Sequence, residues 1–168
     1  MTASREDEYA QQEAQLDDLY RDVILDHYRN PRHRGSLPSA TTSHEGYNPL
    51  CGDEVTVELL VKGGIVEEVA FRGSGCSISQ SSASMMTEAI RRKTVQEVVS
   101  IFKEFTAMMK GSDDVDFDWI GDLEALEGVR KFPVRVKCAT LAWHTLREAL
   151  RRLDQRKDQA VSDERATR

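Results

Sequence analysis

Three cysteines and one aspartate are the residues of this sequence best suited to metal and sulfur chemistry. Cys51 lies in the segment Pro-Leu-Cys-Gly-Asp, so that Asp53 follows it after a single glycine. Cys76 and Cys138 are the other two cysteines of the chain. Three thiolates and one carboxylate make the four donors that a tetrahedral zinc site requires. The sequence therefore predicts a zinc site if the fold brings these four residues together.

Each cysteine has an alternative explanation when it is taken alone. Free cysteine is often buried as a small apolar side chain, and Cys138, on the apolar face of a predicted helix, fits this explanation as well as it fits a metal site. Cys51 lies in a loop bounded by proline and glycine, where functional residues concentrate. Cys76 follows Gly-Ser-Gly at the expected start of a helix, where the backbone N–H groups favour a thiolate.

Histidine is the usual competitor for the fourth ligand position. His144 follows Cys138 by six residues on the same predicted helix, which turns it about 240° away from the cysteine. His27 fits the face of the first predicted helix. Asp53 can turn toward the same point as Cys51 across the intervening glycine, so we favour Asp53 as the fourth ligand.

The predicted strands explain how distant residues meet. Alternating apolar residues predict strands at 55–62 and 65–72, joined by a tight Gly-Gly turn. An antiparallel hairpin brings its two outer ends together. Cys51 and Asp53 before the hairpin, and Cys76 after it, should therefore become neighbours.

The rest of the chain is predicted to be mainly helical. Apolar spacing indicates helices over residues 16–28, 76–92, 95–109 and 138–153, with a short helical piece at 122–126 and a short strand at 42–47. Residues 1–15 and 154–168 are polar and are expected to form a flexible N-terminal tail and a charged, frayed C-terminal tail. The acidic segment 112–122 lacks the glycine and glutamate of a calcium-binding loop, so we interpret it as a solvated connection.

Length and net charge limit the classes of protein to which this chain can belong. A chain of 168 residues is long enough for one domain with a substantial core. The formal net charge is -6 without a basic stripe, so nucleic acid is not an expected partner. The chain shows no apolar segment of membrane-spanning length and no signal-peptide core, so we expect a cytoplasmic protein without a membrane partner.

Four segments together resemble a known family. They are Leu-Tyr-Arg-Asp-Val-Ile-Leu-Asp-His-Tyr at 19–28, Asn-Pro-Leu-Cys-Gly-Asp at 48–53, Gly-Ser-Gly-Cys-Ser-Ile-Ser at 73–79 and Arg-Val-Lys-Cys-Ala-Thr-Leu-Ala-Trp at 135–143. In these segments the chain resembles the SufU proteins, a branch of the IscU/NifU-like proteins of iron–sulfur cluster assembly. The resemblance covers about residues 16–153 and leaves out the two tails.

The resemblance implies a fold, a cofactor and a function. The fold would be a small α/β (α+β) sandwich, in which a three-stranded antiparallel sheet packs against about five helices. One zinc ion per chain would be held by Cys51, Asp53, Cys76 and Cys138. The protein would be a zinc-dependent sulfurtransferase, in which Cys51 accepts sulfur from a SufS-type cysteine desulfurase and passes it to a downstream iron–sulfur assembly complex.

An alternative function is a scaffold on which a [2Fe–2S] cluster is assembled and transferred, with the cluster bound transiently by the same thiolates. IscU-type scaffolds have histidine directly before the third cysteine, where this chain has Lys137, and they lack the long connection at 111–128. Both differences favour the SufU branch. Arg135, one turn before Cys138, either stabilises thiolate charge or forms a surface salt bridge, and the sequence leaves both roles open.

Overall fold

The sheet of this protein has three antiparallel strands in the order β1-β2-β3. The computed structural model describes residues 4–167, and its strands are β1 (Thr42–Asn48), β2 (Asp53–Lys62) and β3 (Ile65–Ser74). The tight turn between β2 and β3 is formed by Gly63 and Gly64, whose φ angles of 57° and 75° favour glycine. The predicted strand and hairpin are therefore confirmed.

The register of the strands positions the ends that matter for the site. Asn48 pairs with Asp53 at one end of the β1-β2 ladder, and Glu54 pairs with Ser74 at the same end of the β2-β3 ladder. The loop that contains Cys51 and the segment that leads to Cys76 therefore leave the sheet at the same edge, as the hairpin argument predicted.

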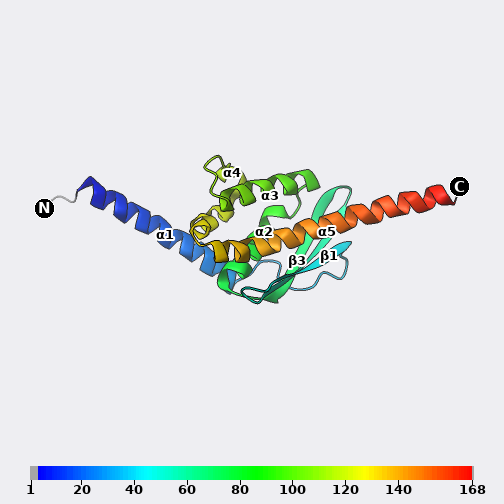
Figure 1. Ribbon diagram of the computed structural model, residues 1–168, viewed down its shortest axis with the longest axis horizontal. Helices are drawn as coiled ribbons and strands as arrows, with labels where there is room; N and C mark the ends of the chain where they lie inside the picture. The colour runs from blue at the N-terminus through cyan, green and yellow to red at the C-terminus, as the bar shows by residue number, and fades with distance from the viewer. Residues whose placement is uncertain (1–3, 168) are drawn as a thin grey trace.

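The helices form two layers on one side of the sheet (Figure 1). They are α1 (Arg5–Arg29), α2 (Ser77–Ile90), α3 (Val95–Met109), α4 (Phe117–Ile120) and α5 (Pro133–Ala166), with a 3-10 segment, η1 (Gly121–Lys131), between the last two. Helices α2 and α5 contact the sheet, and α3 lies on the far side of them. The predicted fold class, a three-stranded antiparallel sheet packed against about five helices, is confirmed.

The hydrophobic core lies between the sheet and the helices. The inward residues of β2 alternate with partly or fully exposed ones as the sequence predicted, and the buried apolar residues are Val55, Val57, Leu59 and Val61. Trp143 of α5 is fully buried and stacks on Phe105 of α3, with 4.7 Å between ring centroids. Ser82 of α2 accepts a hydrogen bond from Trp143 Nε1 at 3.3 Å and donates one to the Ala139 carbonyl at 2.6 Å. These two bonds fix α2 against α5.

Both ends of the chain are more helical than predicted. Helix α1 begins at Arg5 because Ser4 and Asp7 form a capping box, whereas we expected the helix to begin near residue 16. Polar residues can extend a helix without an apolar face, because several of them have high helix propensity. The first three residues of the predicted N-terminal tail lie outside the described part of the chain.

The last helix also differs from the prediction at both of its ends. Helix α5 starts at Pro133, a residue favoured in the first turn, and continues to Ala166 through the segment that was expected to be frayed. Its final turns are exposed and project away from the body of the protein (Figure 1). The division into a domain at 16–153 and two polar tails stays a prediction.

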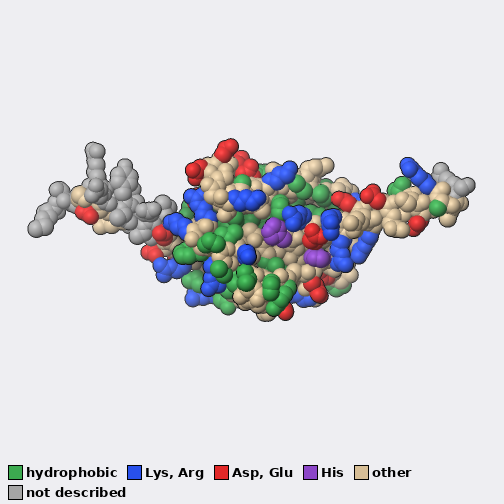
Figure 2. Space-filling view, viewed as in Figure 1, with side chains coloured by type: hydrophobic (Ala, Val, Ile, Leu, Met, Phe, Trp, Pro, Cys, Tyr) green, Lys and Arg blue, Asp and Glu red, His purple; other side chains and the backbone are tan. Residues whose placement is uncertain are grey.

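The described surface is mixed in character. On the face shown in Figure 2, acidic, basic and apolar side chains are interspersed over the body of the protein. Among the described residues, no helix combines the length and apolar character that crossing a bilayer requires.

Candidate metal centre

Three of the four predicted ligands form a compact group. The ligand atoms of Cys51, Asp53 and Cys138 all lie within 4.8 Å of one another. The sulfur atoms of Cys51 and Cys138 are 3.2 Å apart, although 87 positions separate the two residues in the chain. The loop after β1, the start of β2 and the first turns of α5 each supply one residue of the group.

The loop between β1 and β2 is shaped by Asn48 and Gly52. The N–H of Gly52 donates to the carbonyl of Asn48 at 2.8 Å, and Gly52 has a φ of 69°, which glycine adopts without strain. The Asn48 side chain accepts a hydrogen bond from the N–H of Leu50 at 3.2 Å and directs its amide toward Cys138 Sγ at 3.9 Å. This tight turn places Cys51 at the tip of the loop, beside Asp53.

Asp53 is the residue whose surroundings most favour a cation site. Its side chain is fully buried, with an exposed fraction of 0%. One carboxylate oxygen, Oδ1, accepts a hydrogen bond from the backbone N–H of Cys76 at 3.0 Å. The other oxygen, Oδ2, is buried and makes no hydrogen bond within the described part of the chain. A buried polar atom without a partner costs free energy, and a metal ion bound at Oδ2 would remove that cost.

Cys76 lies next to this group but is not part of its tightest cluster. It is the N-cap residue of α2, and its Sγ accepts a long hydrogen bond from the N–H of Ser79 at 3.5 Å. Cys76 is joined to Asp53 by the backbone hydrogen bond described above. The structure therefore brings all four predicted residues to one edge of the sheet, with Cys76 held by the start of α2.

The electrostatics of the centre are those of closely packed thiols. Burial raises the pKa of Cys138, and the neighbouring Cys51 thiol, the Asp53 carboxylate and the charge of Cys76 raise it further. The pKa of the Arg135 guanidinium is raised, first by the Cys76 thiolate and then by a hydrogen bond to Cys138. Among the side chains that the structure describes, no carboxylate forms an ion pair with Arg135. Arg135 therefore lies beside the thiols of the centre, and its thiolate-stabilising role stays a prediction.

Gly75 and Asn48 belong to the site and were not identified from the sequence. A Cβ atom on Gly75 would lie 2.5 Å from Asp53 Oδ1 and 2.5 Å from Ser79 Oγ. Only glycine therefore allows the segment before Cys76 to approach the carboxylate this closely. The signal in the sequence is the Gly-Ser-Gly run, which indicates the start of a helix but not the close approach to Asp53.

Exposed apolar side chains lie close to Cys51 and Cys138 along the chain. Near Cys51 these are Tyr47 and Leu50, and at the start of α5 they are Phe132 and Val134. A groove of about 750 Å³ lies between α1, η1 and the start of α5, and Arg135 is among the residues that line it. Apolar surface next to a reactive centre is typical of a site that other proteins contact.

Fold and site together define a class of protein: a small α+β sandwich that holds a centre of three thiols and one carboxylate at the edge of its sheet. Residues 19–160 of the chain match the NifU-like N terminal domain. The chain therefore belongs to the family of NifU-like N-terminal domains, and the predicted relationship to the IscU/NifU-like proteins is confirmed.

Individual relatives agree with this assignment. The zinc-dependent sulfurtransferase SufU of Bacillus subtilis is 48% identical over 137 residues, which cover 82% of this chain and 92% of the relative. The iron–sulfur cluster assembly scaffold protein IscU of Streptococcus pyogenes is 38% identical, over 83% of this chain and 87% of the relative. A crystal structure of an assembly scaffold protein for the SUF system from Fervidobacterium islandicum superposes with a TM-score of 0.73 at 38% identity, covering 76% of this chain and 93% of that one.

Proposed function

We propose that this protein is a zinc-dependent sulfurtransferase, which accepts sulfur on Cys51 from a SufS-type cysteine desulfurase and passes it on for iron–sulfur cluster assembly. The observation that carries this proposal is the unpartnered Oδ2 of Asp53 beside the paired sulfurs of Cys51 and Cys138. A relative of 48% identity that is named a zinc-dependent sulfurtransferase supports it.

Cys51, Asp53, Cys76 and Cys138 would hold one zinc ion. The donor set fits the metal, because zinc binds thiolate and carboxylate ligands in tetrahedral sites. When bound, zinc keeps its thiol ligands deprotonated at neutral pH. A carboxylate is a harder donor than a thiolate and binds this borderline ion less firmly, so the site is suited to exchange of a ligand.

Cys51 is the residue placed to receive sulfur. It is partly exposed at the tip of its loop, whereas Cys138 is buried. The Cys51 thiolate attacks the terminal sulfur of the persulfide on the donor protein. A new S–S bond forms on Cys51, the S–S bond of the donor breaks, and the donor cysteine leaves as a thiolate. Arg135 lies beside the thiolates of the site and offsets their negative charge.

The neighbouring surface would receive the donor protein. The exposed side chains of Tyr47 and Leu50 lie on one side of Cys51, and those of Phe132 and Val134 lie at the start of α5, which carries Cys138. A cysteine desulfurase that covers these side chains would exclude water from the reacting sulfurs.

The second candidate function is the scaffold for a [2Fe–2S] cluster. Three thiols at one edge of a sheet are ligands that such a cluster also uses, and the Streptococcus relative is named a scaffold protein. Lys137 in place of a histidine ligand favours the sulfurtransferase.

The deciding experiment is intact mass spectrometry with metal analysis, after incubation of the protein with a cysteine desulfurase and cysteine. We expect one added sulfur, located on Cys51 by peptide mapping, with zinc retained and no requirement for iron. Cys51→Ala should accept no sulfur and should keep the circular dichroism spectrum of the wild type. Normal sulfur uptake by that variant would exclude the role of Cys51, and sulfur that accumulates only with iron while zinc is lost would favour the scaffold.

A further inference from the structure

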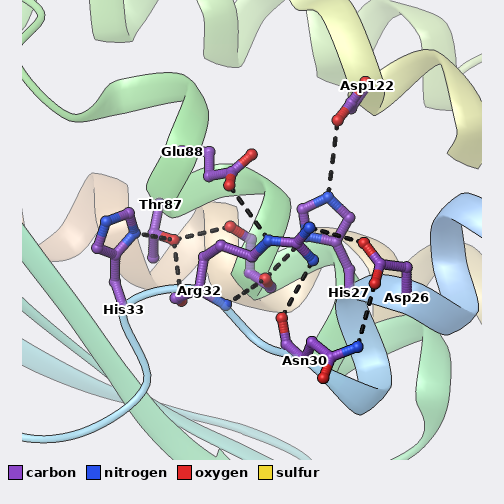
Figure 3. A network of polar contacts seen from close by, with 9 residues as sticks. Asp26, His27, Asn30, Arg32, His33, Thr87, Glu88 and Asp122 are labelled. Atoms are coloured by element: carbon purple, nitrogen blue, oxygen red, sulfur yellow. Dashed lines mark hydrogen bonds and ion pairs between the residues drawn. The ribbon is translucent and has the colours of Figure 1, made fainter.

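A second group of metal-ligating side chains lies away from the thiols. His27 of α1, Glu88 of α2 and Asp122 of η1 each place a ligand atom within 4.8 Å of the others (Figure 3). Cys76 and Glu88 are twelve residues apart along α2, which corresponds to roughly 18 Å at the rise of an α-helix. The group is therefore separate from the thiol centre.

His27 is held in one orientation by its neighbours. Its exposed fraction is 1%, and its Nδ1 lies 2.8 Å from Ser84 Oγ. The same Oγ accepts a hydrogen bond from the backbone N–H of Arg32 at 2.9 Å. In metal sites the second nitrogen of a histidine ligand is usually fixed by a partner of this kind, which orients the ring.

The other nitrogen of this buried ring points toward the carboxylates. His27 Nε2 lies 3.7 Å from Asp122 Oδ2, which is longer than a hydrogen bond. Nε2 has no hydrogen-bond partner within the described residues. A metal ion between the two groups would be bound by the ring nitrogen and by the carboxylate oxygen.

The carboxylates are not neutralised by their basic neighbours. Arg32 is shared, because its Nε lies 3.3 Å from Glu88 Oε1 while its terminal nitrogen lies 2.6 Å from Asp26 Oδ2. Figure 3 shows this guanidinium between the two acidic side chains. Three carboxylates and one guanidinium leave a net negative charge next to Nε2.

There is also space for water ligands beside the two carboxylates. A hollow of about 260 Å³ is lined by Glu88 and Asp122, though not by His27, and opens between α2 and η1. The lysine that lines it, Lys93, lies over the ring of Trp119 at 5.6 Å. Asp122 is exposed by 68%, so the ion can enter from solvent.

We infer that His27 Nε2 and the carboxylates of Glu88 and Asp122 bind a divalent first-row metal ion, with water in the remaining positions. One imidazole and two carboxylates suit ions that accept nitrogen and oxygen ligands, such as Mn²⁺, Fe²⁺ and Zn²⁺. The bound ion connects α1, α2 and η1. This site does not depend on the proposed sulfur transfer.

The test uses the full chain with one equivalent of zinc already bound, so that the thiol centre is occupied. Mn²⁺ is titrated in, and the free ion is followed by its electron paramagnetic resonance signal. We expect one Mn²⁺ per chain. Asp122→Asn, at an exposed position, and His27→Gln should each weaken binding at least about tenfold. Asp118→Asn is the matched control, because it removes the same charge from an exposed site on the preceding helix.

Thermal unfolding gives a second readout that does not rely on the signal of the ion. Mn²⁺ should raise the melting temperature of the wild type and of Asp118→Asn but not that of Asp122→Asn, since a ligand stabilises the state that binds it. If the zinc-loaded wild type binds no Mn²⁺ at millimolar concentration, or if Asp122→Asn and Asp118→Asn behave alike, the group is a purely structural network and the inference is wrong. If His27→Gln does not fold, the comparison of Asp122→Asn with Asp118→Asn is sufficient to test the metal site.

Discussion

Substitution of Gly75 by alanine should damage the metal centre without changing any ligand. The added Cβ would lie 2.5 Å from Asp53 Oδ1 and 3.1 Å from Asp53 Cγ. Ordinary contacts of a Cβ atom begin near 3.4 Å. The carboxylate or the backbone must therefore shift by nearly 1 Å, and Asp53 is fully buried at the start of β2, with little room to move.

This displacement has two measurable consequences. It weakens the hydrogen bond from the Cys76 N–H to Asp53 Oδ1 and shifts the carboxylate from its position beside the thiols. Loss of a supporting contact around a metal ligand typically lowers affinity by about 10- to 100-fold, or roughly 1.4–2.7 kcal/mol. Overpacking of a tight site should also lower the stability of the zinc-free protein by about 1–3 kcal/mol.

Zinc affinity would be measured by competition with a chromophoric chelator, and stability by urea unfolding of the zinc-free protein. Two glycines provide matched controls. Gly128→Ala adds a methyl group with no neighbour within 4 Å and should change neither quantity. Gly46→Ala would press on Thr145 of α5 and should lower stability while leaving zinc affinity unchanged. Zinc affinity of Gly75→Ala equal to that of Gly128→Ala would refute the argument that Gly75 positions Asp53.

Three further predictions concern the core, the pH response and the thiols. Ser82→Ala leaves Trp143 Nε1 without its partner and removes the side-chain hydrogen bond to the Ala139 carbonyl, so it should cost about 1–3 kcal/mol of unfolding free energy in urea. An unchanged midpoint would show that these bonds contribute nothing net. Burial lowers the pKa of His27 below its usual value near 6.5, so the unfolded chain binds this proton more tightly than the folded protein does. The stabilisation that is present above about pH 6.5 should therefore be lost as the pH falls through the folded-state pKa. In urea unfolding with a chelator between about pH 7.5 and pH 5, the unfolding free energy of His27→Gln should decline less steeply than that of the wild type, and identical slopes would contradict this. Arg135→Gln should slow alkylation of the zinc-free thiols at neutral pH, because a positive charge beside them favours the thiolate. Unchanged alkylation kinetics would show that Arg135 does not stabilise the thiolates.

Much of the architecture follows from local patterns. The alternation of Val55, Val57, Leu59 and Val61 requires a strand with one buried face, and the glycine pair after it requires a turn. Because pairing of the two strands is then nearly unavoidable, the neighbourhood of Cys51, Asp53 and Cys76 could be predicted from the sequence. Helix limits at the two ends could not, since polar residues do not show the apolar period on which the prediction depended.

The sequence by itself determined which residues are the candidate donors and the pairing that brings three of them to one edge. Only the tertiary structure decided that Cys138 of α5 reaches this edge, with its sulfur 3.2 Å from that of Cys51. It also revealed the unpartnered Oδ2 of Asp53, the closeness of Gly75 to that carboxylate, and the meeting of His27 with Asp122. Local patterns report the conformation of one segment, whereas these contacts depend on how separate elements pack, and packing is set by the shape of the whole core.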